Sequence, residues 1–161
     1  MKVYLPREDS WLLAYQVRTY ARGNVLDLGT GSGIQAKEAA NKKNVTHVVA
    51  IDKNPRAITY AQKYSRVNHK IEFFTGDLFE PIKKRRCPVK RFDTILFNPP
   101  YLPADKGPPD IAVIGGKHGY EVLERMLNEA NDFLQPNGRM LVVFSSLTNK
   151  QHIDDVIQKN L

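Results

Sequence analysis

The segment Asn98-Pro99-Pro100-Tyr101 has residue types and spacing that could do specific chemistry, and it follows a short apolar run. The side-chain oxygen of Asn98 and the main-chain carbonyl of Pro99 are both acceptors, so together they can hold the two N–H bonds of one planar NH2 group. Proline fixes the backbone and preorganises these acceptors, and Tyr101 can stack on a flat conjugated group. The segment therefore predicts a site for a planar NH2 group, with Asn98, Pro99 and Tyr101 as its catalytic residues.

A planar conjugated nitrogen is a poor nucleophile, so its reaction requires help from the surrounding residues. Two acceptors on its N–H bonds can raise the electron density on the nitrogen, and a fixed position can align it with an electrophilic methyl group. A separate general base is not required, because the proton can leave after the methyl group arrives. The groups that fit are a glutamine side-chain amide, adenine N6, guanine N2 and cytosine N4, and the segment alone does not choose among them.

The segment VLDLGTGSG is glycine-rich and also follows an apolar run. Gly29, Gly31 and Gly33 can adopt positive φ angles and let a ligand approach the backbone closely. The dinucleotide-binding pattern G-x-G-x-x-G fails, because its third glycine position holds Ile34. Asp27 would repel a diphosphate, so the segment favours a cationic ligand.

Two more carboxylates follow later apolar runs. Asp52 ends the second run and can accept two hydrogen bonds from a ribose diol. Asp77 follows the third run and can accept a hydrogen bond from the exocyclic amine of adenine, while Leu78 packs against the ring. Each carboxylate alone could equally cap a helix or stand in a solvated turn. The ordered set, with Asp27 after the first run, favours a ligand that carries a nucleoside.

Short apolar runs alternate with helical patterns along the chain, without an internal repeat or a low-complexity linker. Strands are predicted at residues 25–28, 48–51, 71–74, 94–97 and 140–144. Helices are predicted at residues 10–20, from 54 to about 67, at 119–134 and from 149 to near the end, with a turn at 136–138. This alternation predicts an α/β fold with a doubly wound parallel sheet. Ligands bind such sheets beyond the carboxyl ends of the strands, where both segments fall.

The size and composition of the chain indicate one folded domain. It has 161 residues, of which 42% are hydrophobic and 25% charged, as in ordinary α/β domains. We expect a single domain over residues 1–161, with residues 1–22 as a helical lead-in and residues 23–161 as the catalytic core. The N-terminus is charged where a signal peptide is apolar, and no apolar run approaches the ~20 residues of a membrane span, so we expect a cytoplasmic protein without a membrane partner. Cys87 is the only cysteine, and no Cys/His cluster has zinc-ligand spacing, so no metal is expected.

Positive charge is concentrated in residues 83–91, KKRRCPVKR, which hold six basic and no acidic residues. They account for most of the net charge of +7. The segment is either a solvated loop or a contact with RNA, the ribosome or an acidic protein. It lacks interleaved aromatic residues, so it does not resemble a platform that stacks single-stranded bases.

The glycine-rich segment, the three carboxylates and the NPPY segment together resemble the class I S-adenosylmethionine-dependent methyltransferases over roughly residues 20–146. The resemblance implies a Rossmann-like sheet and S-adenosyl-L-methionine as the cofactor. It implies that Asp27 and residues 29–33 hold the methionine portion, that Asp52 holds the ribose, and that Asp77 with Leu78 holds the adenine. It also adds Ser10 and Asn98 to the cofactor contacts, although Ser10 could equally cap the first helix.

Two further segments resemble the HemK-like N5-glutamine methyltransferases in their compact archaeal and eukaryotic branch. Residues 4–13, YLPREDSWLL, resemble the "P-x-E-D-T/S-hydrophobic-L-L" start of that family, and residues 114–122, IGGKHGYEV, resemble its "GG-x-x-G-x-E-V" segment. The resemblance implies methylation of the glutamine in the Gly-Gly-Gln loop of a peptide release factor. It also implies a small zinc-binding activator subunit. The family fold continues with a sixth and a seventh strand, so we expect a sheet that lacks these last strands and has an exposed edge.

Two alternatives remain open. An RNA or DNA methyltransferase acting on adenine N6 or guanine N2 would use the same NH2 geometry, and the basic segment favours RNA or the ribosome. Reading and flipping a base normally needs a recognition region, however, and 161 residues leave no room for one. The second alternative is a catalytically inactive binding protein of the same fold, which the intact NPPY segment and Asp52 argue against.

Overall fold

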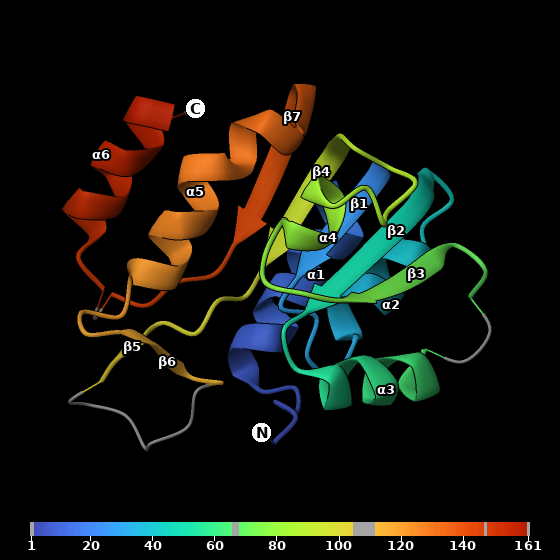
Figure 1. The fold of residues 1–161 in the computed structure, drawn as a ribbon, viewed down its shortest axis with the longest axis horizontal. Helices are drawn as coiled ribbons and strands as arrows, with labels where there is room; N and C mark the ends of the chain where they lie inside the picture. The colour runs from blue at the N-terminus through green and yellow to red at the C-terminus, as the bar shows by residue number, and fades with distance from the viewer. Residues whose placement is uncertain (1, 66–67, 105–111, 147, 161) are drawn as a thin grey trace.

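The protein has the α/β architecture that the alternating sequence pattern predicts (Figure 1). A computed structural model describes residues 2–65, 68–104, 112–146 and 148–160. The helices are α1 (Glu8–Tyr20), α2 (Ile34–Ala40), α3 (Pro55–Tyr64), α4 (Glu80–Lys83), α5 (Glu121–Phe133) and α6 (Lys150–Asn160). The strands are β1 (Gly23–Leu28), β2 (Val45–Asp52), β3 (Ile71–Thr75), β4 (Phe92–Phe97), β5 (Leu102–Pro103), β6 (Ile114–Gly116) and β7 (Leu134–Val142).

Five strands form one parallel sheet in the order β3-β2-β1-β4-β7. The order reverses between β1 and β4, which are neighbours in space although two strands separate them in sequence. This doubly wound arrangement places a crevice beyond the carboxyl ends of β1 and β4, the usual ligand position in such sheets. Two short strands, β5 and β6, pair separately near the same end of the sheet (Figure 1).

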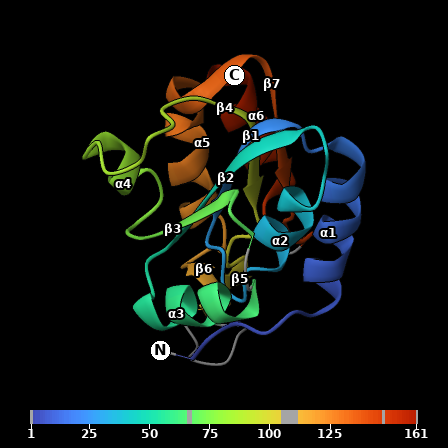
Figure 2. The same cartoon turned by 90° about the vertical axis from the view of Figure 1, so that its right-hand side faces the viewer.

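Helices cover both faces of the sheet, and the strand residues alternate between two cores (Figure 2). On β1, Leu26 and Leu28 pack toward α4, α5 and α6, whereas Val25 packs toward α1 and α2. β2 alternates in the same way, with Val49 on the first face and Val48 on the second. Burial on both faces explains why these strands read as continuous apolar runs in the sequence.

Some element boundaries differ from the sequence expectation. The last strand of the sheet begins at Leu134 rather than Met140, and the predicted turn at 136–138 lies within it. The turn remains as an irregularity, because the register with β4 shifts there and Asn137 has a positive φ of 62°. α3 ends at Tyr64, whereas the sequence extended it to about Val67, which lies outside the described residues. The short elements α4, β5 and β6 were not predicted, because so few residues carry no periodic signal.

The predicted exposed edge belongs to β7, which pairs only with β4 among the described strands. Within the described ranges, no helix has the length and apolar character needed to cross a membrane.

Candidate active site

The turn after β1 is built from glycines with positive φ angles. Gly29 has a φ of 60° and Gly31 a φ of 53°, conformations that residues with a Cβ rarely adopt. The N–H of Thr30 donates to the carbonyl of Ile51 on β2 over 3.0 Å, which fixes the turn against the neighbouring strand. The two glycines therefore present bare main chain at the carboxyl end of β1.

Gly33, the third glycine of the segment, serves helix packing instead. It is the N-cap of α2 with a φ of 83°, and a Cβ there would lie 2.9 Å from the Cβ of Ala61 on α3. Gly33 is buried and does not line the cavity described below. The close approach of α2 to α3 therefore explains this glycine, which the sequence had grouped with the ligand-binding turn.

Asp27 is a buried carboxylate at the end of β1, with 1% of its surface exposed. Its Oδ2 accepts hydrogen bonds from the Thr30 hydroxyl at 2.6 Å and from the Ala36 N–H at 3.1 Å, so it ties the turn to α2. Burial raises the pKa of Asp27 to about 7, because the two hydrogen bonds only partly offset the loss of water. A cation placed beside Asp27 would favour its ionised form.

Asp52 is the last residue of β2, and both of its carboxylate oxygens accept main-chain N–H groups. Oδ2 accepts from Gly31 at 2.9 Å and Oδ1 from Asn54 at 2.8 Å. Burial raises the pKa of Asp52 against the lowering effect of these two hydrogen bonds. Each carboxylate oxygen can accept a second hydrogen bond, so a pair of adjacent hydroxyls could still bind here.

Asp77 follows β3 and is paired with a residue that the sequence did not single out. Its Oδ2 forms an ion pair with Arg125 of α5 at 2.6 Å, and both side chains are about half exposed. The next residue, Leu78, is 9% exposed and has a φ of 46°, an uncommon conformation for a residue with a branched side chain. Backbone strain of this kind concentrates at functional sites, where the surrounding structure maintains it.

Asn98 directly follows β4, and its side-chain amide is oriented by Asp9 of α1. The Nδ2 of Asn98 donates to Oδ2 of Asp9 at 3.0 Å. Because a carboxylate only accepts, this contact fixes which end of the amide is nitrogen. The Oδ1 of Asn98 is buried and has no hydrogen-bond partner among the described residues. A buried acceptor without a partner costs stability, so it marks a place where a donor is expected to bind.

Asp9 also receives hydrogen bonds from two tyrosines. The hydroxyl of Tyr101 donates to Oδ2 at 3.1 Å, and the hydroxyl of Tyr4 donates at 3.1 Å to the same oxygen. Burial alone would raise the pKa of Asp9, but the hydrogen bonds from Asn98, from the N–H of Ser10 and from both tyrosines lower it below its ordinary value. Burial, together with the charge of Asp9, raises the pKa of Tyr101. Asp9 therefore stays ionised and Tyr101 stays protonated.

The NPPY backbone is packed against glycines of the loop that contains β6. A Cβ on Gly115 would lie 2.4 Å from the carbonyl oxygen of Pro100, and a Cβ on Gly119 would lie 2.6 Å from that of Tyr101. Only glycine leaves room for such close main-chain contact. This packing gives a physical reason for the GG-x-x-G segment that the sequence supplied only as a resemblance.

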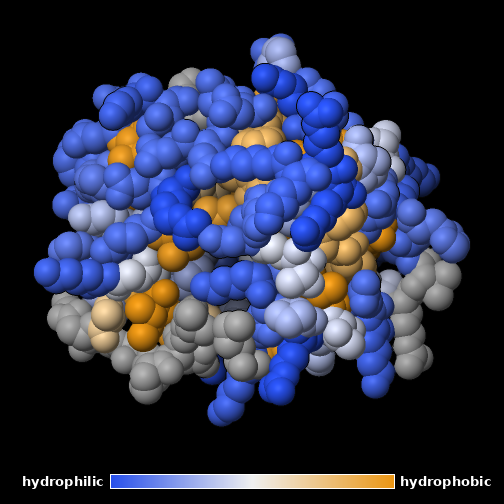
Figure 3. All heavy atoms as spheres, in the orientation of Figure 1, coloured by the Kyte–Doolittle hydropathy of each residue, from blue (hydrophilic) through white to orange (hydrophobic). Residues whose placement is uncertain are grey.

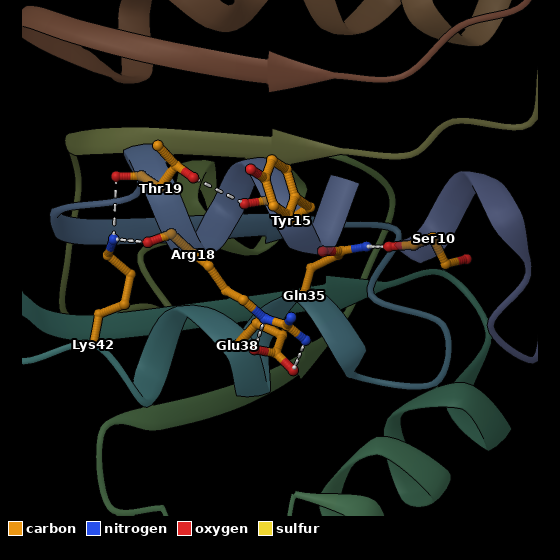
Figure 4. A network of polar contacts seen from close by, with 7 residues as sticks. All are labelled: Ser10, Tyr15, Arg18, Thr19, Gln35, Glu38 and Lys42. Atoms are coloured by element: carbon orange, nitrogen blue, oxygen red, sulfur yellow. Dashed lines mark hydrogen bonds and ion pairs between the residues drawn. The ribbon is translucent and has the colours of Figure 1, made fainter. Parts of the chain in front are cut away.

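Both ends of α1 are held in place by contacts with α2 (Figure 4). The amide of Gln35 donates to the carbonyl of Ser10 at 2.8 Å, and the guanidinium of Arg18 pairs with Glu38 at 2.8 Å. The hydroxyl of Ser10 accepts the N–H of Arg7 at 3.3 Å, which is the helix-capping role that the sequence left open. These contacts position Asp9 so that it reaches Asn98 across 89 residues of sequence.

A single cavity of about 390 Å³ joins these elements at the carboxyl ends of β1, β2 and β4. Every predicted site residue except Gly33 lines it, namely Ser10, Asp27, Gly29, Gly31, Asp52, Asp77, Leu78, Asn98, Pro99 and Tyr101. Several polar lining residues were not singled out from the sequence, among them Tyr4, Asp9 and Arg125. Asp9 stood within the P-x-E-D-T/S resemblance but was given no role, because an acid in the first turn of a helix is explained by the helix dipole. Arg125 lies within α5 and belongs to no motif that the sequence offered.

The fold and this cavity define a class I methyltransferase, and the comparisons with known proteins agree. The family model of the methyltransferase small domain matches residues 8–160. The chain belongs to the methyltransferase small domain family, whose cofactor is S-adenosylmethionine.

Curated relatives carry protein methyltransferase names. A protein of Methanocaldococcus jannaschii that is provisionally named a protein N5-glutamine methyltransferase is 36% identical over 93% of this chain and 76% of its own length. A release factor glutamine methyltransferase of Koribacter versatilis is 34% identical, over 87% of this chain and 54% of the relative. A ribosomal protein uL3 glutamine methyltransferase of Burkholderia pseudomallei is 35% identical, over 88% of this chain and 52% of the relative. The chain thus spans about half the length of the two bacterial relatives.

Solved structures share the fold. A ribosomal protein methylase of Lactobacillus delbrueckii superposes with a TM-score of 0.72 at 20% identity, over 98% of this chain and 71% of that one. A complex between the Haloferax volcanii Trm112 methyltransferase activator and a methyltransferase matches with a TM-score of 0.55 at 20% identity, over 82% of this chain and 51% of that one. At these identities the likeness establishes the fold alone.

The cavity fits S-adenosylmethionine by the chemistry of its lining. The cofactor carries a sulfonium and an ammonium group, a ribose diol and an adenine. The carboxylates of the buried Asp27 and the partly buried Asp52, whose pKa values are raised, match the cationic groups and the diol. The Oδ1 of Asn98, which has no partner among the described residues, belongs to a side chain that lines the same cavity.

Proposed function

We propose that this chain methylates a glutamine side-chain amide, and that its substrate is the Gly-Gly-Gln loop of a peptide release factor. The observation that carries the proposal is the Asn98 amide, whose nitrogen is held by Asp9 and whose buried oxygen has no partner among the described residues. That oxygen is oriented to accept one N–H of a substrate NH2. The carbonyl of Pro99 accepts the other, and Tyr101, fixed through its hydroxyl by Asp9, flanks the planar amide.

The roles of the cofactor residues follow from their contacts. In this proposal Asp27, Gly29 and Gly31 hold the methionine portion, Asp52 holds the ribose diol, and Asp77 with Leu78 holds the adenine. Ser10 lines the same cavity beside the methionine portion. When bound, S-adenosylmethionine supplies an electrophilic methyl group on its sulfonium. The surrounding residues orient the target nitrogen, and the ionised Asp9 favours the positive charge that the nitrogen acquires during transfer.

The names of the relatives support a protein glutamine as the substrate. The name of one relative gives a release factor as its substrate, and the name of another gives ribosomal protein uL3. Both names give glutamine as the methylated residue. The ribosomal protein is therefore the nearest competing protein substrate.

The position of the basic segment argues against the alternative that the substrate is a nucleic acid. Residues 83–91 begin at the last residue of α4 and lead into the amino end of β4, whereas Asn98 follows the carboxyl end of β4. Six strand residues at ~3.3 Å each separate the two ends by roughly 20 Å. The basic segment therefore does not lie beside the acceptor site, as a substrate RNA would require.

The proposal includes an activator partner. α1 exposes Trp11 at 52%, Leu12 at 58% and Tyr15 at 64%, and Leu12 lines a groove with residues 140–144 of β7 and the segment after it, where β7 pairs only with β4 among the described strands. Exposed apolar side chains next to a free strand edge are typical of a surface covered by a partner. Titration of the H. volcanii Trm112 activator into the wild type and Tyr15→Glu should give binding that this substitution weakens. Tyr60→Glu on α3, a tyrosine that is 39% exposed, is the matched control and should bind normally.

The experiment that tests the substrate class is methyl transfer from radiolabelled S-adenosylmethionine into a cell extract, with and without the activator. The product is divided between nuclease and protease treatment. Label that survives nuclease and is released by protease is the expected result. Label released by nuclease would overturn the proposal in favour of an RNA or DNA amine.

A third outcome would identify the chain as a catalytically inactive binding protein. It would bind S-adenosylmethionine in a calorimetric titration but transfer no label to any extract, with or without the activator. The aligned Asn98 amide predicts that this outcome does not occur.

A further inference from the structure

The amino ends of the five parallel strands carry a row of basic side chains. Because the strands are parallel, the residues that precede them lie together at one end of the sheet. Four of the strands have a basic residue shortly before their first residue. The fifth strand, β7, has one just after the point where its register with β4 shifts. The row is Lys70 at β3, Lys42 and Lys43 at β2, Arg22 at β1, Arg91 at β4 and Arg139 on β7. We call this row, together with residues 83–90, the amino edge.

Main-chain carbonyls hold most of this row in place. Lys70 donates to the carbonyls of Lys42 and Val45 at 2.9 and 2.8 Å, and Arg91 donates to that of Leu134 at 2.9 Å. Arg22 donates to the carbonyl of Asn137 at 2.8 Å. Carbonyl contacts fix the position of a cation without cancelling its charge. The row therefore presents ordered and uncompensated positive charge.

The remaining two contacts are of the same kind. Lys42 donates to carbonyls in the last turn of α1, and Arg139 donates to the carbonyl of Tyr20 at 3.4 Å. Among the described residues, no member of the row forms an ion pair with a carboxylate. Three cations near this end do form ion pairs, and they lie beside the row: Lys83 with Glu129, Lys84 with Glu80, and Arg18 with Glu38.

Carboxylates also lie near this end of the sheet, but the cations outnumber them. Glu72 on β3 contacts His47 at 3.1 Å. Asp93 accepts the N–H of Asn24 at 2.8 Å, and Asp132 is exposed at the end of α5. Arg85, Arg86 and Lys90 are all exposed on the loop that leads to β4. Figure 3, in the orientation of Figure 1, shows hydrophilic side chains over most of the end at which the strands begin.

We propose that the amino edge binds the phosphate backbone of structured RNA. Strands ~4.8 Å apart spread five cationic positions over about 19 Å, a length that faces several successive phosphates. A protein partner is less suited, because protein interfaces have an apolar centre and this row has none. The choice of RNA over DNA rests on the proposed function, since a release factor acts in translation.

The inferred surface lies at the end of the sheet opposite Asn98, so bound RNA would anchor the enzyme without entering the cavity. The expected binding is electrostatic and independent of base sequence. Its affinity should fall steeply with salt.

The test is fluorescence anisotropy of a labelled RNA hairpin titrated with the full chain at several salt concentrations. The wild type should bind and lose affinity between about 50 and about 200 mM salt. The triple variant Arg85→Glu, Arg86→Glu and Lys90→Glu should weaken binding at least about 10-fold and flatten the slope of log affinity against log salt by about one for each phosphate that it no longer neutralises. The matched control reverses the charge of three exposed side chains at the opposite end of the sheet, with Arg56→Glu, Lys63→Glu and Lys117→Glu. This control should bind RNA much more tightly than the edge variant.

The outcomes separate this inference from the proposed function. The edge variant should methylate a short peptide containing Gly-Gly-Gln as fast as the wild type, since its substitutions lie far from the cavity. Absence of RNA binding by the wild type, equal binding by the edge variant, or tighter binding of a DNA duplex or of poly-glutamate would overturn the inference, whether or not the peptide is methylated. Failure to methylate the peptide would overturn only the proposed function.

Discussion

The two ends of the parallel sheet carry opposite chemistry. At the carboxyl end, the buried Asp27 and the partly buried Asp52 accept main-chain N–H groups, and their pKa values are raised. At the amino end, Arg22 and Arg91 are exposed cations that donate to main-chain carbonyls. The same strands therefore separate a site that attracts a cationic small molecule from a surface that attracts anions. A parallel sheet can keep two proposed binding functions apart, because it sorts the segments between its strands to its two ends.

The largest effect is expected at the acceptor of the carboxyl end. Asn98→Ala removes the buried oxygen that receives the substrate N–H, and the rate of methyl transfer should fall by about 10²–10³, the scale expected when one preorganised hydrogen-bonding group is removed. Cofactor affinity should change by only a few-fold. Single-turnover transfer and calorimetry with S-adenosylhomocysteine measure the two quantities. Equal loss of both would mean that Asn98 chiefly maintains the fold.

The next effect tests whether Asp9 acts through Asn98. In Asp9→Asn the new amide can donate, so the Asn98 amide is free to flip, and kcat should fall on the order of 10-fold to 100-fold with little change in KM. Glu8→Gln removes the same charge from the same helical turn and is the matched control. Adding Asp9→Asn to Asn98→Ala should cost little more, because the two residues act as one unit. Additive losses would refute this coupling.

A smaller effect distinguishes the carboxylates from one another. Asp52→Ala should weaken cofactor binding by about 1–3 kcal/mol, the scale of a lost hydrogen bond to a charged group. Asp77→Ala should weaken it less, because Asp77 is about half exposed and already paired with Arg125. Calorimetric titration of S-adenosylmethionine measures both. A larger loss at Asp77 than at Asp52 would reverse the assignment of the ribose and adenine ends.

The smallest effect is a pH dependence from Asp27. Its pKa is about 7 in the folded protein and near 4 in an unfolded chain, so the folded form binds the proton more tightly. Ionising Asp27 therefore lowers the stability of the ligand-free protein as pH rises from about 4 to about 7, with no further loss above that. Affinity for the cationic cofactor should increase over the upper part of the same range. Asp27→Asn should remove this increase, and an unchanged profile in that variant would exclude Asp27 as its source.

The fold was predictable because its signals are local. Apolar runs such as residues 94–97 mark buried strands, and Asn54-Pro55 marks the start of α3, where the Asn54 side chain accepts the N–H of Arg56. The start of β7 was missed because Pro136 and Gly138 read as a turn, whereas the structure keeps them as an irregularity within the strand.

The site was only partly predictable, because its decisive contacts join distant segments. The NPPY segment identified Asn98, but the carboxylate that orients it comes from α1, where an acid in the first turn is explained by the helix dipole. The ion pair of Asp77 with Arg125 likewise joins the loop after β3 to α5, two segments that are 48 residues apart in the sequence. Gly33 shows the opposite error, since a helix-packing glycine stood within a ligand-binding pattern.

Mass spectrometry of a Gly-Gly-Gln peptide incubated with the wild-type chain, S-adenosylmethionine and the activator would show whether the chain is a glutamine methyltransferase. We expect one added methyl group, located by fragmentation on the side-chain nitrogen of the glutamine, and no addition to a peptide with asparagine in its place. An unmodified peptide, under conditions in which the chain does methylate a nucleic-acid base, would refute the glutamine assignment.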